Sequence, residues 1–225
     1  MAVNRGVKTF IDRFDRAQSL TTTPGMNGWT IADTSAAGTP TYLVATDTGM
    51  TLTCDSTSEA QVVSVYQNDV LIYDLASLQS IWFVTKFVAQ ADAVTTLTMG
   101  VGSARNSTAD SVTVNAWFRV EGSVSVSNLL CETDDNTTDN DDKAAGTGLL
   151  LVYKKLLIDF TKGLADVRFY CDGARVAQAT TFDMSAVTAG QNVQPIIMLQ
   201  KASGTGVPAL SVVEFGAQYR YAEGA

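Results

Sequence analysis

Hydrophobic and polar residues alternate along much of this chain with the period of two that is typical of β-strands. The alternation is clear at 61–66 and at 93–101, whereas 80–89 is a longer apolar run. Val and Thr are frequent between scattered glycines, which favours strands joined by tight turns. The pattern predicts about a dozen strands, at residues 29–33, 41–45, 50–54, 61–66, 80–89, 93–101, 111–121, 123–130, 149–160, 165–171, 174–180, 193–200 and 210–221.

One hairpin is strongly indicated near the C-terminus. Asp172-Gly173 stands between two β-prone runs and predicts a type I′ turn, in which both central residues have positive φ. Lys162-Gly163 predicts a turn just before it, so that three strands form a meander. The spacing of apolar residues within 149–160 also fits a short helix, but we favour a strand because 158–160 leads directly into the turn. Residues 75–80 fit one or two helical turns.

Turn signals recur every 8–12 residues and no helices alternate with the strands, which predicts an all-β sandwich or barrel. A length of 225 residues suits one domain of this class. We therefore expect a single β-sandwich domain at 17–225. Residues 1–16 are expected to form an N-terminal arm or an ordinary first strand.

Composition removes several classes of protein. The longest apolar runs are far shorter than the roughly 20 residues of a membrane-spanning helix. The absence of histidine removes Ser-His-Asp catalysis and His-ligated zinc. A formal net charge of −8 argues against sequence-independent nucleic-acid binding. Residues 1–10 lack the apolar segment of a signal peptide, so we expect no secretion by that route.

The three cysteines, Cys54, Cys131 and Cys171, are widely spaced and form no C-x-x-C motif. We interpret them as free, buried thiols in a protein assembled in a reducing cytoplasm.

Residues 132–143 form the one strongly acidic stretch. Asp139, Asp141 and Asp142 are candidate Ca²⁺ ligands, because this ion prefers carboxylate and carbonyl oxygens. The stretch lacks the D-x-[DN]-x-[DN]-G spacing of an EF-hand, however. We therefore expect a mobile, solvated loop without a dedicated metal, and an adventitious or inter-subunit cation stays open as the alternative.

Two further sets of residues are candidates for binding. Residues 1–16 carry a net charge of +2 on a chain that is otherwise −10, so they suit docking to an acidic partner or to a neighbouring subunit. Tyr219 and Tyr221 alternate at the end of the last strand and are candidates to face a ligand, whereas Trp82 and Trp117 are expected in the core. The docking candidates are Arg5, Lys8, Arg13 and Arg16.

Three short motifs resemble a known family. Phe10-Ile-Asp-Arg-Phe-Asp-Arg16 is followed by Gly28-Trp29, Trp117-Phe-Arg-Val120 lies in the middle, and Ile158-Asp-Phe160 precedes Asp166-Val-Arg-Phe-Tyr-Cys-Asp-Gly173. Together they resemble the concanavalin-A-like (laminin-G-like) jelly rolls of bacteriophage and bacterial proteins. The resemblance implies an all-β jelly-roll sandwich.

Glycosidases of this fold carry acidic residues in a pattern such as E-x-D-x-x-E, because hydrolysis needs two carboxylates at a set separation. None of the predicted strands offers this pattern. Glu121, Asp159, Asp166, Asp172 and Glu214 stand singly, and Glu132, Asp134 and Asp135 fall at the start of the acidic stretch. We therefore expect a protein that is not an enzyme and has no catalytic residues, metal or cofactor.

These observations lead to one functional hypothesis and two alternatives. The first is a structural protein of a bacteriophage virion, a capsid decoration protein that binds the major capsid protein or other virion proteins. It would be assembled in the host cytoplasm as a homo-oligomer, with a trimer favoured, and would contact neither nucleic acid nor membrane. The alternatives are a carbohydrate- or receptor-binding module of a phage tail or fibre, and an unusual glycosidase.

Overall fold

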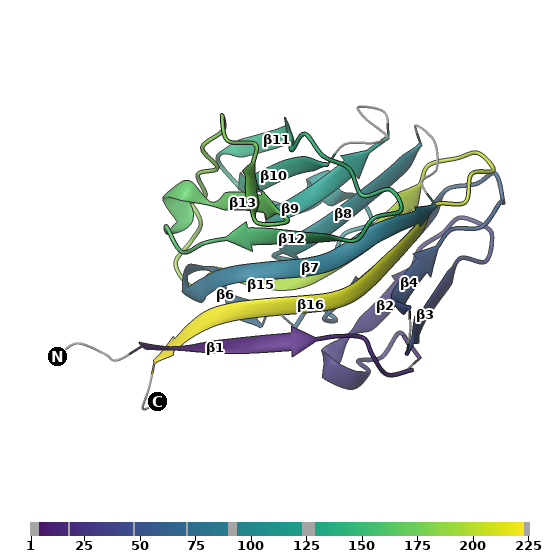
Figure 1. Cartoon of the computed structure of the whole chain (residues 1–225), viewed down its shortest axis with the longest axis horizontal. Helices are drawn as coiled ribbons and strands as arrows, with labels where there is room; N and C mark the ends of the chain where they lie inside the picture. Colours follow the sequence, from purple (N-terminus) through teal and green to yellow (C-terminus); the bar gives the residue numbers. More distant parts are fainter. Residues whose placement is uncertain are drawn as a thin grey trace.

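The structure, a computed structural model, describes residues 5–17, 19–46, 48–70, 72–89, 94–122 and 129–222. In these ranges two antiparallel sheets of eight strands each form a β-sandwich (Figure 1). Sheet A has the order β14 (Ala174–Val176), β13 (Arg168–Cys171), β12 (Lys154–Asp159), β7 (Leu78–Ala89), β16 (Ala209–Ala222), β4 (Gly49–Thr53) and β3 (Thr41–Ala45), and β1 (Arg5–Asp12) also pairs with β16.

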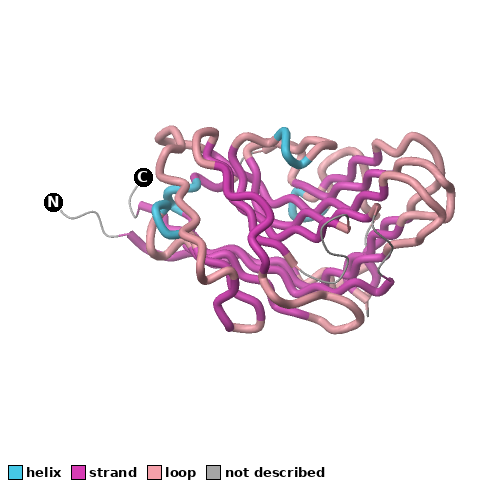
Figure 2. The backbone as a smooth tube through the Cα atoms, turned by 90° about the horizontal axis from the view of Figure 1, so that it is seen from above, coloured by secondary structure: helices cyan, strands magenta, loops and turns pink. Residues whose placement is uncertain are grey.

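Sheet B has the order β11 (Asp139–Ala144), β10 (Leu130–Asp135), β9 (Val114–Glu121), β8 (Thr95–Gly102), β15 (Asn192–Lys201), β5 (Gln61–Tyr66) and β2 (Thr30–Asp33), and β6 (Tyr73–Asp74) also pairs with β15. Figure 2 shows how little of the backbone is helical. The short 3-10 turns of the described residues are η1 (Met26–Gly28), η2 (Leu75–Ser77), η3 (Ala109–Ser111) and η4 (Leu164–Asp166). None of the described helices is long and apolar enough to cross a membrane.

Aromatic rings join the first, seventh and last strands inside the sandwich. Phe215 of β16 lies 5.3 Å from Phe83 of β7, 5.4 Å from Trp29 and 6.0 Å from Phe10 of β1, measured between ring centroids. Phe215, Phe83 and Trp29 are almost completely buried. Alternation along each strand sends these side chains inward and their chain neighbours outward.

The structure confirms the predicted fold class, a jelly-roll β-sandwich. The hairpin of β13 and β14 turns at Asp172 (φ 50°) and Gly173 (φ 80°), as the Asp-Gly dipeptide predicted. Strands β12, β13 and β14 form the predicted meander. The three cysteines are free and buried, also as predicted.

The prediction of a solvated loop at 132–143 was wrong. The stretch forms the β10–β11 hairpin, which turns at Asn136 (φ 68°). The Asp135 carboxylate, itself buried, accepts hydrogen bonds from the backbone N–H groups of Thr137, Thr138 and Ala186, so local bonding satisfies the turn and ties it to a distant loop.

Of the strand predicted at 123–130, residues 123–128 lie outside the described residues.

The N-terminal segment contributes an edge strand. Residues 5–12 of β1 pair in register with β16, from Arg5 opposite Ala222 to Asp12 opposite Phe215 (Figure 1). Of the two alternatives for residues 1–16, a docking arm or an ordinary first strand, the described residues 5–12 form a first strand, which leaves Val7 and Ile11 exposed.

The structure explains the motif that joins residues 10–16 to Gly28-Trp29. The buried Asp12 carboxylate accepts hydrogen bonds from the Trp29 indole N–H (2.9 Å), the Asn27 side-chain amide (2.9 Å) and the Phe14 backbone N–H (3.1 Å). The Phe14 ring then packs on Trp29, with ring centroids 5.7 Å apart. One acidic side chain therefore fixes the end of β1 to the following loop.

Replacing this carboxylate should destabilise the whole sandwich. We expect Asp12→Ala to lower the free energy of unfolding by about 3 kcal/mol, because it leaves the Trp29 and Phe14 N–H groups buried without an acceptor. Urea denaturation measures the change. The exposed neighbour Asp15→Ala is the control and should change stability by less than about 0.5 kcal/mol. Equal effects of the two substitutions would contradict this role for Asp12.

Candidate functional site

Part of the outer face of sheet B is covered by the chain itself. Residues 103–113, including η3, cross this face, and Ala109 and Val112 pack there on Trp117, Ile196 and Met198 as a second hydrophobic cluster. Side chains on the neighbouring strands hold the segment in place. The Asn115 amide donates to the Val112 carbonyl (2.9 Å), and the Gln200 amide donates to the Ser107 carbonyl (2.6 Å).

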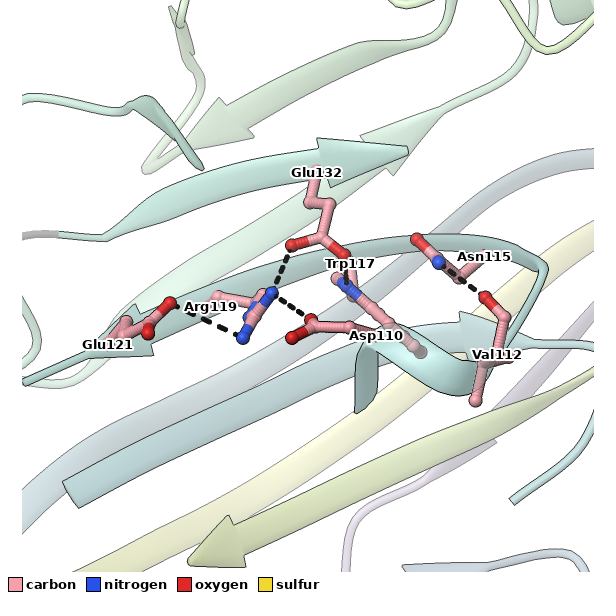
Figure 3. Close-up of polar contacts among 7 residues, drawn as sticks. All are labelled: Asp110, Val112, Asn115, Trp117, Arg119, Glu121 and Glu132. Carbon is pink, nitrogen blue, oxygen red and sulfur yellow. Dashed lines mark hydrogen bonds and ion pairs between the residues drawn. The ribbon is translucent and has the colours of Figure 1, made fainter. Parts of the chain in front are cut away.

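A network of charged side chains lies on the same face, centred on Arg119 (Figure 3). Arg119 Nη1 lies 2.6 Å from Glu132 Oε2 and 2.6 Å from Asp110 Oδ1, and its Nη2 lies 3.4 Å from Glu121 Oε2. The Trp117 indole N–H donates to Glu132 Oε1 at 2.9 Å. Each carboxylate oxygen of Glu132 thus has a donor from β9.

Burial sets the electrostatics of this network. Arg119 is 6% exposed and Glu132 is 2% exposed. Burial raises the pKa of Glu132 to about 7, although Arg119 and the Trp117 N–H oppose this shift. Burial alone would lower the pKa of Arg119, but the carboxylates of Glu132, Asp110 and Glu121 outweigh it and the pKa is raised. The guanidinium therefore stays charged.

The expectation that the chain offers no alternating acids on a strand was wrong. Glu132 and Asp134 are two residues apart on β10 and share its outer face, and Asp139 of β11 lies opposite Asp134. Although Asp139 is exposed, partial desolvation by its neighbours raises its pKa to about 6, with a further contribution from a hydrogen bond with Asp141. Since Arg119 and Trp117 hold both Glu132 oxygens, the arrangement is a closed ion-pair cluster.

The predicted candidates for metal ligands lie on β11. Asp139 and Asp141 are exposed, and Asp142 is half-buried with a positive φ of 51°. Across the described ranges, no group of three or more Cys, Asp and Glu side chains is placed to hold a metal ion.

The outer face of sheet A is different, because a row of mostly apolar residues crosses it that is exposed at Ile11, buried at Gly216 and Trp82, and half-buried at Leu157 and Tyr170. Ile11 of β1, Gly216 of β16, Trp82 of β7, Leu157 of β12 and Tyr170 of β13 are successive partners in the strand register. We call these five residues the apolar row. Four strand spacings of about 4.8 Å give it a length of about 19 Å.

A groove of about 420 Å³ lies over one end of the apolar row. Leu157 and Tyr170, both half-buried, provide its apolar surface. Polar groups surround them, as in sites where a few polar side chains orient a ligand on an apolar surface. These are Ser80, Lys155, Asp159 and Thr161, and Gly173 completes the lining.

Trp82 continues the row beyond the groove; it is buried, as expected, but it lies on the outer face of sheet A and not in the main cluster between the sheets. Its indole lies directly over Gly216, where a Cβ atom would come within 2.0 Å of the ring. The indole N–H donates to Glu214 Oε1 at 2.7 Å, and Lys155 Nζ lies over the ring, 5.0 Å from its centroid. Trp117 also faces outward, into the second cluster on sheet B.

The residues chosen from the sequence as docking candidates are spread over the β1 region. Lys8 lies over the Tyr221 ring, 4.3 Å from its centroid. Arg13 is exposed and lies 3.6 Å from Glu214, and Arg16 lines a shallow pocket with Asp15. Arg5 belongs to β1, but its side chain lies outside what the structure describes.

The two candidate tyrosines sit on the inner side of the end of β16. Tyr219 packs on the core, with its ring 5.5 Å from that of Tyr73, and Tyr221 lies beneath Lys8. Neither tyrosine lines the groove of sheet A. The sequence did not indicate Tyr170 and Leu157 as candidates for binding, although it predicted the meander that carries them. Only the strand register shows that these two residues continue the row from Trp82.

Comparison with known proteins establishes the fold. No protein-family model matches the chain, and no curated protein sequence matches it significantly. Among solved structures, the non-specific endo-β-1,3(4)-glucanase SCLam of family GH16 has a TM-score of 0.64 at 10% identity and covers 98% of this chain and 94% of its own. The Bacillus licheniformis β-glucanase has a TM-score of 0.59 at 14% identity, over 93% of this chain and 97% of its own.

The carbohydrate recognition domain of Emp47p is similar to the same degree, with a TM-score of 0.60 at 8% identity, over 93% of this chain and 96% of its own. These similarities confirm the predicted concanavalin-A-like jelly roll. They also correct the expectation of a non-enzymatic protein. Since two of these structures are glucanases, the fold gives no ground for excluding an enzyme, and that conclusion is withdrawn.

The raised pKa of Glu132 has a consequence for stability. Between pH 4.5 and about 7, Glu132 stays protonated in the native state, whereas an unfolded glutamate releases its proton. Proton binding by Glu132 therefore stabilises the native state. This contribution to the free energy of unfolding is complete below pH 4.5 and is lost as pH rises through 7. We expect the melting temperature to fall between pH 5 and pH 8, and Glu132→Gln to remove much of that fall. Thermal melts across this range test it, with the exposed Glu59→Gln as control. Equal slopes in wild type and Glu132→Gln would contradict the assignment.

Proposed function

We propose that this protein binds carbohydrate, and that its binding site is the groove on the outer face of sheet A. The observation that carries the proposal is the apolar surface of Leu157 and Tyr170 with Asp159, Ser80 and Lys155 around it. A pyranose ring has an apolar C–H face and a rim of hydroxyl groups. Such a ligand fits an aromatic surface bordered by hydrogen-bonding side chains.

The polar groups of the groove can both accept hydrogen bonds from the hydroxyl groups of a sugar and donate hydrogen bonds to them. The Asp159 carboxylate accepts hydrogen bonds, and the hydroxyls of Ser80 and Thr161 either accept or donate them. Asp159 and Ser80 face each other across β12 and β7, so their positions are set by the sheet. Sites held on strands in this way are more rigid than sites on loops.

The similar structures support the same ligand class. One is a carbohydrate recognition domain and two act on β-glucans, as their names state. Residues 103–113 cover the region of Trp117, Ile196 and Met198 on sheet B, whereas the groove on sheet A is accessible to a saccharide.

The sequence resemblance suggests a setting for this activity. Under the hypothesis of a virion protein, the sandwich would decorate a capsid or form part of a tail or fibre, as a homo-oligomer that contacts other virion proteins. This setting stays a prediction from the motifs alone. Mass spectrometry of purified virions would test it, because hundreds of copies per particle indicate a capsid role and a few copies indicate a tail.

Binding is testable by calorimetric titration of β-1,3-linked and mixed β-1,3/1,4-linked gluco-oligosaccharides. We expect Tyr170→Ala to weaken binding about tenfold, since an aromatic contact of this kind contributes roughly 0.5–1.5 kcal/mol beyond the area it buries. Asp159→Asn should also weaken it, because Asp159 Oδ1 already accepts the Thr161 N–H (2.8 Å) and an amide has no second oxygen to accept from a sugar hydroxyl.

Tyr221→Ala is the matched control, because it removes a half-buried tyrosine from the same sheet outside the groove. Loss of binding in Tyr221→Ala but not in Tyr170→Ala would move the site to the end of β16. No binding of any saccharide on a broad glycan array would overturn the proposal. Assay of new reducing ends in the same samples reports whether a bound glucan is also cleaved.

A further inference from the structure

The groove is bordered by an aromatic surface that the protein keeps covered. Trp82 is 7% exposed although it lies on the outer face of sheet A, outside both hydrophobic clusters. One face of its indole rests on Gly216, so the backbone of β16 covers that side. The Lys155 side chain covers the ring from above, with Nζ 5.0 Å from the ring centroid.

The two sides of the indole are held very differently. Gly216 is main chain in the centre of sheet A, paired with both β1 and β7, and cannot move without breaking the sheet. Lys155 is an exposed side chain on a flexible four-carbon stem. A cation–π contact at an exposed site is weak, so a ligand can displace this ammonium at little cost.

The position of the indole is fixed by its polar edge as well as by Gly216. The Trp82 N–H donates to Glu214 at 2.7 Å, and Arg13 lies 3.6 Å from the other Glu214 oxygen. When Lys155 moves away, the indole therefore stays in place as a flat surface beside Leu157, its partner in the register and part of the groove lining.

We propose that Trp82 is a second, covered subsite of the groove, and that a hexopyranose unit displaces the Lys155 ammonium to stack on the indole. This inference rests on the carbohydrate-binding function proposed above and extends it. The groove would hold one sugar unit against Tyr170 and Leu157, and the next unit would lie over Trp82. The apolar row, about 19 Å long, suits an oligosaccharide better than a single ring.

Tryptophan fluorescence gives a direct test, because the other two tryptophans, Trp29 and Trp117, are each only 1% exposed. Without ligand, Lys155→Ala should raise acrylamide quenching and shift the emission to the red, since it uncovers Trp82 alone. The matched control is Lys86→Ala, which removes the same kind of contact from Tyr153, where Nζ lies 4.3 Å from the ring centroid. It should leave tryptophan quenching unchanged.

With a β-1,3-linked glucohexaose as the probe, binding to wild type should protect Trp82 from acrylamide. Lys155→Ala should bind the probe about three-fold more tightly, because the ligand no longer displaces a cation–π contact of modest strength. Trp82→Leu should lose most of the binding. If that variant does not fold, the protection of Trp82 in wild type and Lys155→Ala still decides the question.

The possible failures are distinguishable. If the probe binds and depends on Tyr170, but Trp82 is not protected and Lys155→Ala binds no more tightly, the covered subsite is wrong and the carbohydrate site stands. If Lys155→Ala leaves quenching unchanged, Lys155 is not a cover and the inference is also overturned. If no saccharide binds any variant, the proposed function fails and this subsite fails with it.

Discussion

The register between β7 and β16 is the constraint on which the rest of the molecule depends. Phe83 pairs with Phe215, and this places both rings in the core. The adjacent pair in the register, Trp82 with Gly216, lies on the outer face of sheet A. β16 needs an irregularity to achieve this, because Val212 and Phe215 both point inward although they are three residues apart. The register shift between Val212 and Glu214 supplies the extra residue. A slip by one position would bury Glu214 and expose Phe215.

The two outer faces of the sandwich differ in how their charged and aromatic side chains are arranged. On sheet B, Arg119 and its carboxylates lie beside the cluster that includes Trp117, and both oxygens of Glu132 have donors, although the buried Arg119 Nε has no hydrogen-bond partner. Buried ion pairs of this kind add little net stability, because removing the charges from water offsets their attraction. On sheet A, Trp82 lies under the exposed Lys155 side chain, and Tyr170 lines a groove together with polar groups such as Ser80 and Thr161.

The sequence predicted the fold far better than the site. Alternation and turn residues such as Asp172-Gly173 are local, and they identified the meander and most strands. The acidic hairpin was missed because Asp and Asn disfavour strands by propensity, whereas pairing of β10 with β9 and contacts such as Glu132 with Trp117 decide the outcome. Trp82 was assigned to the core because apolar runs do not reveal which residues face inward. Its true position depends on Gly216, which is 134 positions away in the chain.

This separation of core from outer face explains how one fold supports different activities. Because side chains alternate strictly, the inward residues that specify the sandwich, such as Phe83 and Ile158, constrain their outward neighbours Trp82 and Leu157 in position but not in chemistry. On sheet B, the buried Glu132 lies beside the half-buried Asp134 and the exposed Asp139, whereas sheet A carries Tyr170 and Asp159 around a groove. The activity proposed for this chain rests on the outward residues of the sheet A groove, whose chemistry the core residues leave free to vary.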